Sequence, residues 1–165
     1  MAVTTIETGR QQVVVRERTS ADVGLLFLRL TLGVIFFMHG SQKVLGLFGG
    51  HGLADSVAGM GHMGIVAPLA YLSIFTEFLG GLMLILGALT RLAAFASMIN
   101  MIVAVALVHF KNGFFMNGSS GPGYEYNLAL IGMSIALILT GPGALALGDW
   151  EIRLFKKPKT AKSGI

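Results

Sequence analysis

Residues Ile65 to Leu89, IVAPLAYLSIFTEFLGGLMLILGAL, are apolar throughout apart from one acid, Glu77, and a few hydroxyl groups. A helix crosses the roughly 30 Å hydrocarbon core of a bilayer in about 20 residues. Backbone polar groups must be paired within the segment in lipid, so this stretch predicts a transmembrane helix. An ionised carboxylate in hydrocarbon is costly, which makes Glu77 a candidate functional residue.

Three further stretches meet the same length requirement, at about residues 23–40, 92–110 and 124–143. The chain is 54% hydrophobic and only 12% charged, whereas about 25% of the residues in a soluble domain are charged. Small residues recur along the four stretches and allow helix backbones to approach closely in lipid. The sequence therefore predicts an all-α protein, an integral membrane four-helix transmembrane bundle.

The distribution of cations predicts the orientation. Nine Lys and Arg residues lie in the N-terminal segment, the turn near Arg91 and the C-terminal tail, whereas only Lys43 and Lys111 lie in the two remaining loops. Cytoplasmic loops carry the excess of Lys and Arg, so both termini are expected in the cytoplasm. We expect a cytoplasmic segment over residues 1–22, a transmembrane domain over 23–148 and a basic cytoplasmic tail over 149–165.

Composition also excludes some classes of function. The formal net charge is +4, but the cations flank apolar segments instead of forming one basic face, which favours contact with a lipid bilayer and not with nucleic acid. The chain has no cysteine, so it cannot carry thiol–disulfide chemistry or a thiolate metal site by itself. The first apolar run lacks a cleavage site of the signal-peptide kind, and we interpret it as a retained helix.

Two charged residues lie inside the predicted spans. Arg29 is expected either to snorkel toward the interface or to pair with a carboxylate or with carbonyls at a helix end. Glu77 lies deeper, beside Gly80 and Gly81 on the same helical face, which leave room next to its carboxyl group. Glu77 could form a salt bridge with Arg29, remain protonated and hydrogen-bonded, or bind a ligand, and the sequence leaves these alternatives open.

A group of polar side chains is expected at the outer ends of the spans. His39 and Lys43 are four residues apart and share a helical face, His109 ends the third span, and Tyr124 and Glu125 open the fourth. These positions place five polar side chains at one membrane depth. A single histidine at such a position is ordinarily an interfacial residue, so it is the convergence that indicates a functional site.

Several chemistries fit this group. Imidazole and carboxylate can exchange protons, which makes Glu77, His109 and Glu125 candidates for a catalytic proton or quinone site. His39, Lys43 and Tyr124 are then candidate ligand-binding residues. Two histidines and a carboxylate could also bind a divalent metal, and paired histidines could hold a haem. The sequence leaves the metal undetermined and makes a quinone the candidate cofactor.

An ordered set of motifs resembles the DoxX family of small bacterial membrane proteins. The set spans about residues 25–150 and consists of Arg29-x3-Gly33, His39-Gly40, Lys43, Glu77-x2-Gly80-Gly81, Gly87, Thr90-Arg91-x-Ala93-Ala94, Met101, His109, Tyr124-Glu125 and Gly141-Pro142-Gly143 with Asp149. Near its end the chain has Leu147-Gly148-Asp149 where the family often has serine, leucine and aspartate. The resemblance implies a four-helix protein of the bacterial inner membrane, associated with membrane oxidoreductase systems.

Three functions follow from these observations. The chain is expected to be a membrane subunit of a redox complex, with a quinone or protons bound at the outer polar group and electrons carried by a partner. The alternative is a structural or assembly subunit that binds other membrane proteins, or further copies of itself, and has no chemistry of its own. A small transporter is the least favoured, because four helices without an inverted repeat are few for transport by a monomer. Any enzymatic role would be that of a membrane oxidoreductase subunit.

Overall fold

The structure is a computed structural model that describes residues 3–8, 11–16, 19–117 and 121–147. The expected C-terminal tail at 149–165 lies outside the described residues, as does Asp149 of the family motif. The expected division into segment, transmembrane domain and tail, and the orientation of the termini, therefore stay predictions.

The first span is a long helix, α1 (Ser20–Leu45). It begins at a capping box, in which the Thr19 hydroxyl accepts a hydrogen bond from the backbone N–H of Asp22 and the Asp22 carboxylate accepts one from the backbone N–H of Thr19 at 2.9 Å. This reciprocal arrangement satisfies N–H groups that would otherwise lack a partner at the helix start. The helix ends at Gly46, whose φ of 68° lies in the left-handed region. Because of these signals α1 extends beyond the apolar run in both directions.

The remaining spans follow as antiparallel helices. A short helix, α2 (Leu53–His62), precedes α3 (Ala67–Leu86), and α3 ends at Gly87 with a φ of 69°. Only three residues separate α3 from α4 (Thr90–Ala104), so the turn near Arg91 closes a tight helical hairpin. The third span continues through a π-helical turn, η1 (Val105–His109), and a 3-10 turn, η2 (Phe110–Asn112). The last helix is α5 (Glu125–Thr140).

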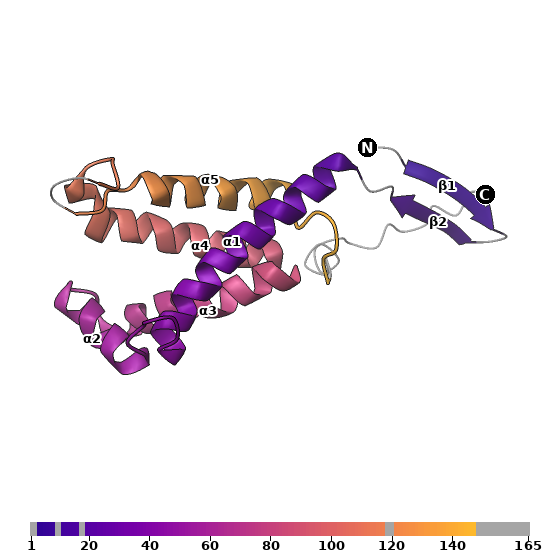
Figure 1. Ribbon diagram of the computed structural model, residues 1–165. Coiled ribbons are helices and arrows are strands. Elements are labelled where there is room, and N and C mark those ends of the chain that lie inside the picture. Colours follow the sequence, from indigo (N-terminus) through magenta and orange to yellow (C-terminus); the bar gives the residue numbers. More distant parts are fainter. Residues whose placement is uncertain (1–2, 9–10, 17–18, 118–120, 148–165) are drawn as a thin grey trace, which may run out of the picture.

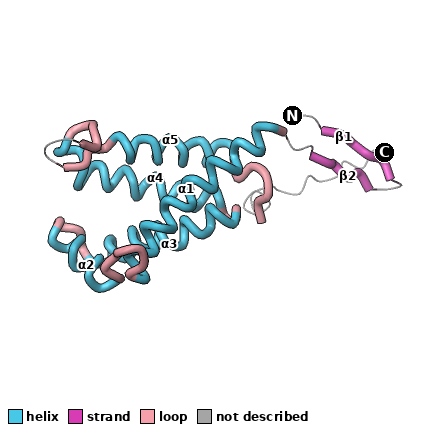
Figure 2. The backbone as a smooth tube through the Cα atoms, in the orientation of Figure 1, coloured by secondary structure: helices cyan, strands magenta, loops and turns pink. Residues whose placement is uncertain are grey.

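The helices form a closed bundle in which α1 packs against α3, α3 against α4, α4 against α5, and α5 against α1. Figure 1 shows α2 and the loop between α4 and α5 at one end of the bundle, and the start of α1 at the opposite end. This arrangement confirms the predicted all-α membrane bundle. An antiparallel hairpin of β1 (Val3–Thr8) and β2 (Gln11–Arg16) precedes it in the chain and was not expected from the sequence (Figure 2).

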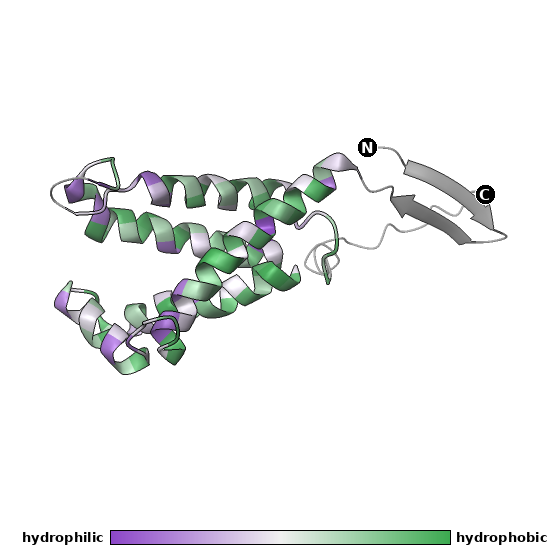
Figure 3. Cartoon of the chain, viewed as in Figure 1, coloured by the Kyte–Doolittle hydropathy of each residue, from purple (hydrophilic) through white to green (hydrophobic). Residues whose placement is uncertain are grey.

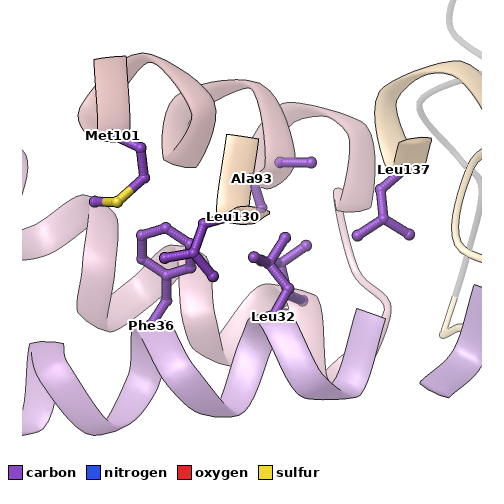
Figure 4. Packing of buried hydrophobic residues seen from close by; sticks show 8 residues of the cluster. Leu32, Phe36, Ala93, Met101, Leu130 and Leu137 are labelled. Atoms are coloured by element: carbon purple, nitrogen blue, oxygen red, sulfur yellow. The ribbon is translucent and has the colours of Figure 1, made fainter. Parts of the chain in front are cut away.

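Apolar side chains fill the inside of the bundle and also cover its outside. Leu32 and Phe36 of α1 meet Ala93 and Met101 of α4 and Leu130 of α5 in the centre (Figure 4). Hydrophobic residues also face outward along the helices, as expected for a surface in contact with lipid (Figure 3). Residues Ser20–Leu45, Ala67–Leu86 and Thr90–Asn112 are long and apolar enough to cross a membrane, and α5 is an apolar helix of 16 residues.

Glycines bring α1 and α3 into close contact. A Cβ atom added at Gly40 would overlap the backbone of Phe78, and one added at Gly81 would overlap the backbone of Phe37. At Gly33 an added Cβ would lie 2.9 Å from the backbone nitrogen of Ile85. The small-residue pattern therefore lets the two backbones touch, as in other membrane helix pairs. This contact determines where side chains of α1 meet Glu77 on α3.

Candidate functional site

Glu77 is buried on α3 and forms an ion pair with Lys43 near the end of α1. The Lys43 Nζ atom lies 2.7 Å from Glu77 Oε1 and 2.6 Å from Oε2, so the ammonium group contacts both carboxylate oxygens. The Glu77 side chain is only 7% exposed and that of Lys43 is 29% exposed. A charge in this environment needs such a partner, because desolvation without compensation is costly. Of the alternatives for Glu77, the structure shows a salt bridge, but with Lys43 and not with Arg29.

Two polar side chains extend this pair into a hydrogen-bonded chain. Asn100 of α4 donates from Nδ2 to Glu77 Oε1 at 3.3 Å, and Ser73 of α3 donates from Oγ to Asn100 Oδ1 at 2.7 Å. The site thus joins α1, α3 and α4. The Glu77 carboxylate accounts for the orientation of the Asn100 amide, because a carboxylate only accepts hydrogen bonds and therefore faces the amide nitrogen. The amide oxygen is left to accept from the Ser73 hydroxyl.

Ser73 and Asn100 were not among the site residues predicted from the sequence. Two signals could have indicated them. Ser73 lies one helical turn before Glu77 on the same face, and Asn100 is a polar residue within an otherwise apolar span. The sequence does not show which residue the Asn100 amide contacts. Only the packing of α4 against α3 identifies Glu77 as its partner.

Arg29 serves a different part of the molecule. Its side chain is buried and donates to the backbone oxygens of Pro142 at 2.9 Å and Leu145 at 3.2 Å, in the segment after α5. The guanidinium group packs so closely against Gly87 that a Cβ atom there would overlap it. Arg91 donates similarly to the Ile138 oxygen at 2.6 Å, at the end of α5. Arg29 therefore binds carbonyls at a helix end, one of the roles expected for it.

The outer polar residues do not all join Glu77. His109 Nδ1 lies 3.0 Å from the backbone oxygen of Pro122, and Glu125 Oε1 accepts from the Met116 N–H at 2.7 Å. Tyr124 stacks on Phe110 and meets the edge of Phe114. These contacts organise the loop between α4 and α5. His39 is exposed and forms no hydrogen bond within the described part of the chain.

The geometry also bears on the metal hypothesis. Across residues 19–117 and 121–147, no group of three His, Asp or Glu side chains is placed to hold a metal ion. The set of His39, His109 and a carboxylate is therefore not assembled. Hydrogen bonds and ring contacts instead place Lys43 and Glu77 in one group, and His109, Tyr124 and Glu125 in another at the loop between α4 and α5.

A cavity of about 440 Å³ opens beside the ion pair. Its walls come from the end of α1, the glycine-rich loop after it and α2, and its polar lining includes Lys43, His51 and Asp55. This volume lies within the range of small-molecule pockets, about 300–1,000 Å³. Lys43 therefore contacts the buried carboxylate on one side and the cavity on the other.

Comparison with known proteins agrees with this architecture. The family model described as DoxX matches residues 24–110. The chain is 32% identical over 134 residues to a Bacillus subtilis (strain 168) protein named "Putative oxidoreductase CatD", covering 81% of this chain and 91% of the relative. It is 31% identical over 126 residues to an Escherichia coli (strain K12) protein named "Inner membrane protein YqjF", covering 76% and 90%. No solved structure matches. The spanning helices and these matches show that the chain is a membrane protein and belongs to the DoxX family.

Proposed function

We propose that this protein is a membrane subunit of a redox complex, in which the cluster of Lys43, Glu77 and Asn100 binds a quinone head group and exchanges protons with it. The observation that carries the proposal is the position of Lys43, which pairs with a buried carboxylate and also lines a cavity large enough for a small ligand. A paired acid and base next to such a cavity is a common arrangement in proton-transfer sites.

The residues have distinct roles in this proposal. Reduction of a quinone to a quinol takes up two electrons and two protons. The Lys43 ammonium, which lines the cavity, would donate a hydrogen bond to a quinone carbonyl. The Glu77 carboxylate would take up each proton from water and pass it on to the reduced oxygen. Asn100 would hold the carboxylate in position. The sequence carries no evident nucleotide or flavin fingerprint, so the electrons would come from a partner protein.

His109 and Glu125 take no part in the proposed proton transfer. Their hydrogen bonds go to backbone groups of the outer loop, which supports a role in holding that loop. Glu125 is therefore a matched control for Glu77, because both are carboxylates and both accept hydrogen bonds.

The names of the relatives support the same assignment. One relative is named as an oxidoreductase and another as an inner membrane protein. We infer from them that this chain is a multi-pass protein of the bacterial inner membrane. From the first of these names we infer that this chain, too, belongs to an oxidoreductase system.

The test begins with purification of the chain from its native membranes in mild detergent and mass spectrometry of proteins present in equal amount. Quinone reduction by the purified complex is then compared for the wild type, Glu77→Gln and Glu125→Gln. We expect Glu77→Gln to reduce the rate at least tenfold while the complex stays assembled, and Glu125→Gln to have a much smaller effect. An unchanged rate in Glu77→Gln would refute the proposal. If Glu77→Gln instead disrupts the complex, and no redox protein co-purifies with the wild type, the structural role would be favoured.

A further inference from the structure

The cavity beside Lys43 differs from an apolar hollow elsewhere in the described part of the bundle. That hollow, of about 530 Å³, lies between α4 and α5 and has an almost wholly apolar lining that includes Ile102, Val105 and Leu128. Asn100 faces Glu77, and Ile102 lies two residues further along α4, about 200° around the helix. The apolar hollow therefore opens on a different face and does not lead to the buried carboxylate.

The cavity beside Lys43 is instead built from the polar end of the molecule. Besides Gln42 and Lys43 of α1, its lining comes from the glycine-rich loop, from α2, a helix with no buried residue, and from Met63 directly after it. His51 and Asp55 line it and are exposed. Loops and exposed helices at the end of a span belong to the aqueous interface, because unpaired backbone groups cannot face hydrocarbon.

We infer that this cavity is an aqueous access route to the Lys43–Glu77 pair, which it reaches at Lys43, and that it admits a compact molecule other than an anion, with hydroxyl or carbonyl groups on an apolar ring. The inference rests on the proposed function and adds the direction of access and the class of ligand. The substrate reaches the ion pair from the water on the side of α2, without passing through the bilayer.

The lining determines the class of ligand. Glu77 neutralises the positive charge of Lys43. Asp55 therefore gives the cavity lining a net negative charge, which disfavours the binding of anions. Met60 and Met63 provide apolar walls with flexible thioether side chains that adapt to a ring. Lys43 and Ser56 offer hydrogen-bond donors to hydroxyl or carbonyl groups.

Two glycines on α2 provide a matched pair of variants. Gly59 lines the cavity, whereas Gly61 lies on the same helix and is absent from the lining. A Cβ atom added at either position would meet no other atom within 4 Å. A side chain can therefore begin at either position without a clash at its Cβ atom, and only at Gly59 does it begin on the cavity wall.

The natural absence of cysteine permits a direct measurement of access. A single cysteine is introduced by Glu77→Cys, and its reaction with a charged, water-soluble thiosulfonate is timed in the purified full chain. The thiolate forms a mixed disulfide and a sulfinate leaves, so the rate reports water access to position 77 independently of any redox activity. We expect Gly59→Trp to slow labelling at least tenfold and Gly61→Trp to change it less than twofold.

Because Glu77→Cys removes a partner of Lys43, the same comparison is repeated with Lys43→Cys, which lies at the cavity wall. Equal labelling rates in the Gly59→Trp and Gly61→Trp backgrounds, at both cysteine positions, would overturn the access route and leave the proposed redox function standing. Binding of hydroquinone, measured by calorimetry on the chain without introduced cysteines, tests the class of ligand. Saturable binding that Gly59→Trp abolishes and Gly61→Trp preserves would support the assignment, and no binding to the wild type would overturn it.

Discussion

The ion pair between Lys43 and Glu77 predicts a large thermodynamic coupling between the two residues. The perturbation is a double-mutant cycle of Lys43→Met, Glu77→Gln and the combined variant. Removing one partner of a buried pair typically costs about 3–5 kcal/mol, because the other charge is left without compensation. The Lys43 side chain is 29% exposed, so solvent screening reduces the expected cost to about 2–3 kcal/mol.

The two single variants should differ. Lys43→Met leaves the Glu77 carboxylate, which is 7% exposed, without its cation. Glu77→Gln leaves the ammonium of Lys43, which can turn into the adjoining cavity and be hydrated. We therefore expect Lys43→Met to be the more destabilising variant. The combined variant removes both charges and should be more stable than Lys43→Met alone.

The assay is thermal unfolding of the purified protein in detergent, followed by circular dichroism. A cost of about 2–3 kcal/mol corresponds to a decrease in Tm of about 4–12 °C for a chain of this size. We expect a coupling energy of about 2 kcal/mol or more, since contacting residues are not additive. Additivity of the two single variants within about 0.5 kcal/mol would refute the pairing and the site built on it.

Three further predictions follow from other contacts. Gly40→Ala should lower the free energy of unfolding by about 1–3 kcal/mol, because the added methyl group meets the backbone of α3. Gly132→Ala is the control in the same unfolding assay and should not destabilise the protein, because a Cβ atom there meets no other atom within 4 Å. Arg29→Met should lower the free energy of unfolding by about 3 kcal/mol, because hydrogen bonds from a charged donor to two backbone carbonyls are lost. The segment after α5 should then be cleaved faster by a protease, and unchanged cleavage there would contradict this role of Arg29. Asn100→Leu should reduce quinone reduction about tenfold with the ion pair still present, because the Glu77 carboxylate loses the amide that orients it; a wild-type rate would exclude that role.

Much of the architecture is encoded in local patterns. The apolar runs have the length of a bilayer crossing, so their helical structure follows from the need to pair every backbone group within the segment. The apolar runs that end at Leu89 and begin at Leu92 leave only a short turn near Arg91, and small residues along the spans indicated close helix contact. These features depend on composition and periodicity along one segment. The sequence alone was therefore enough to determine the membrane bundle and to select Glu77 as its unusual residue.

The partners of the charged residues were decided only by tertiary structure. Lys43 and Glu77 are far apart in the chain, and they meet because glycine contacts set the register of α1 against α3. Arg29 was the salt-bridge partner that the sequence suggested for Glu77, yet it lies where α1 meets the carbonyls after α5. The sequence shows which charged residues need a polar partner in lipid. The relative depth and rotation of the packed helices determine which groups provide that partner.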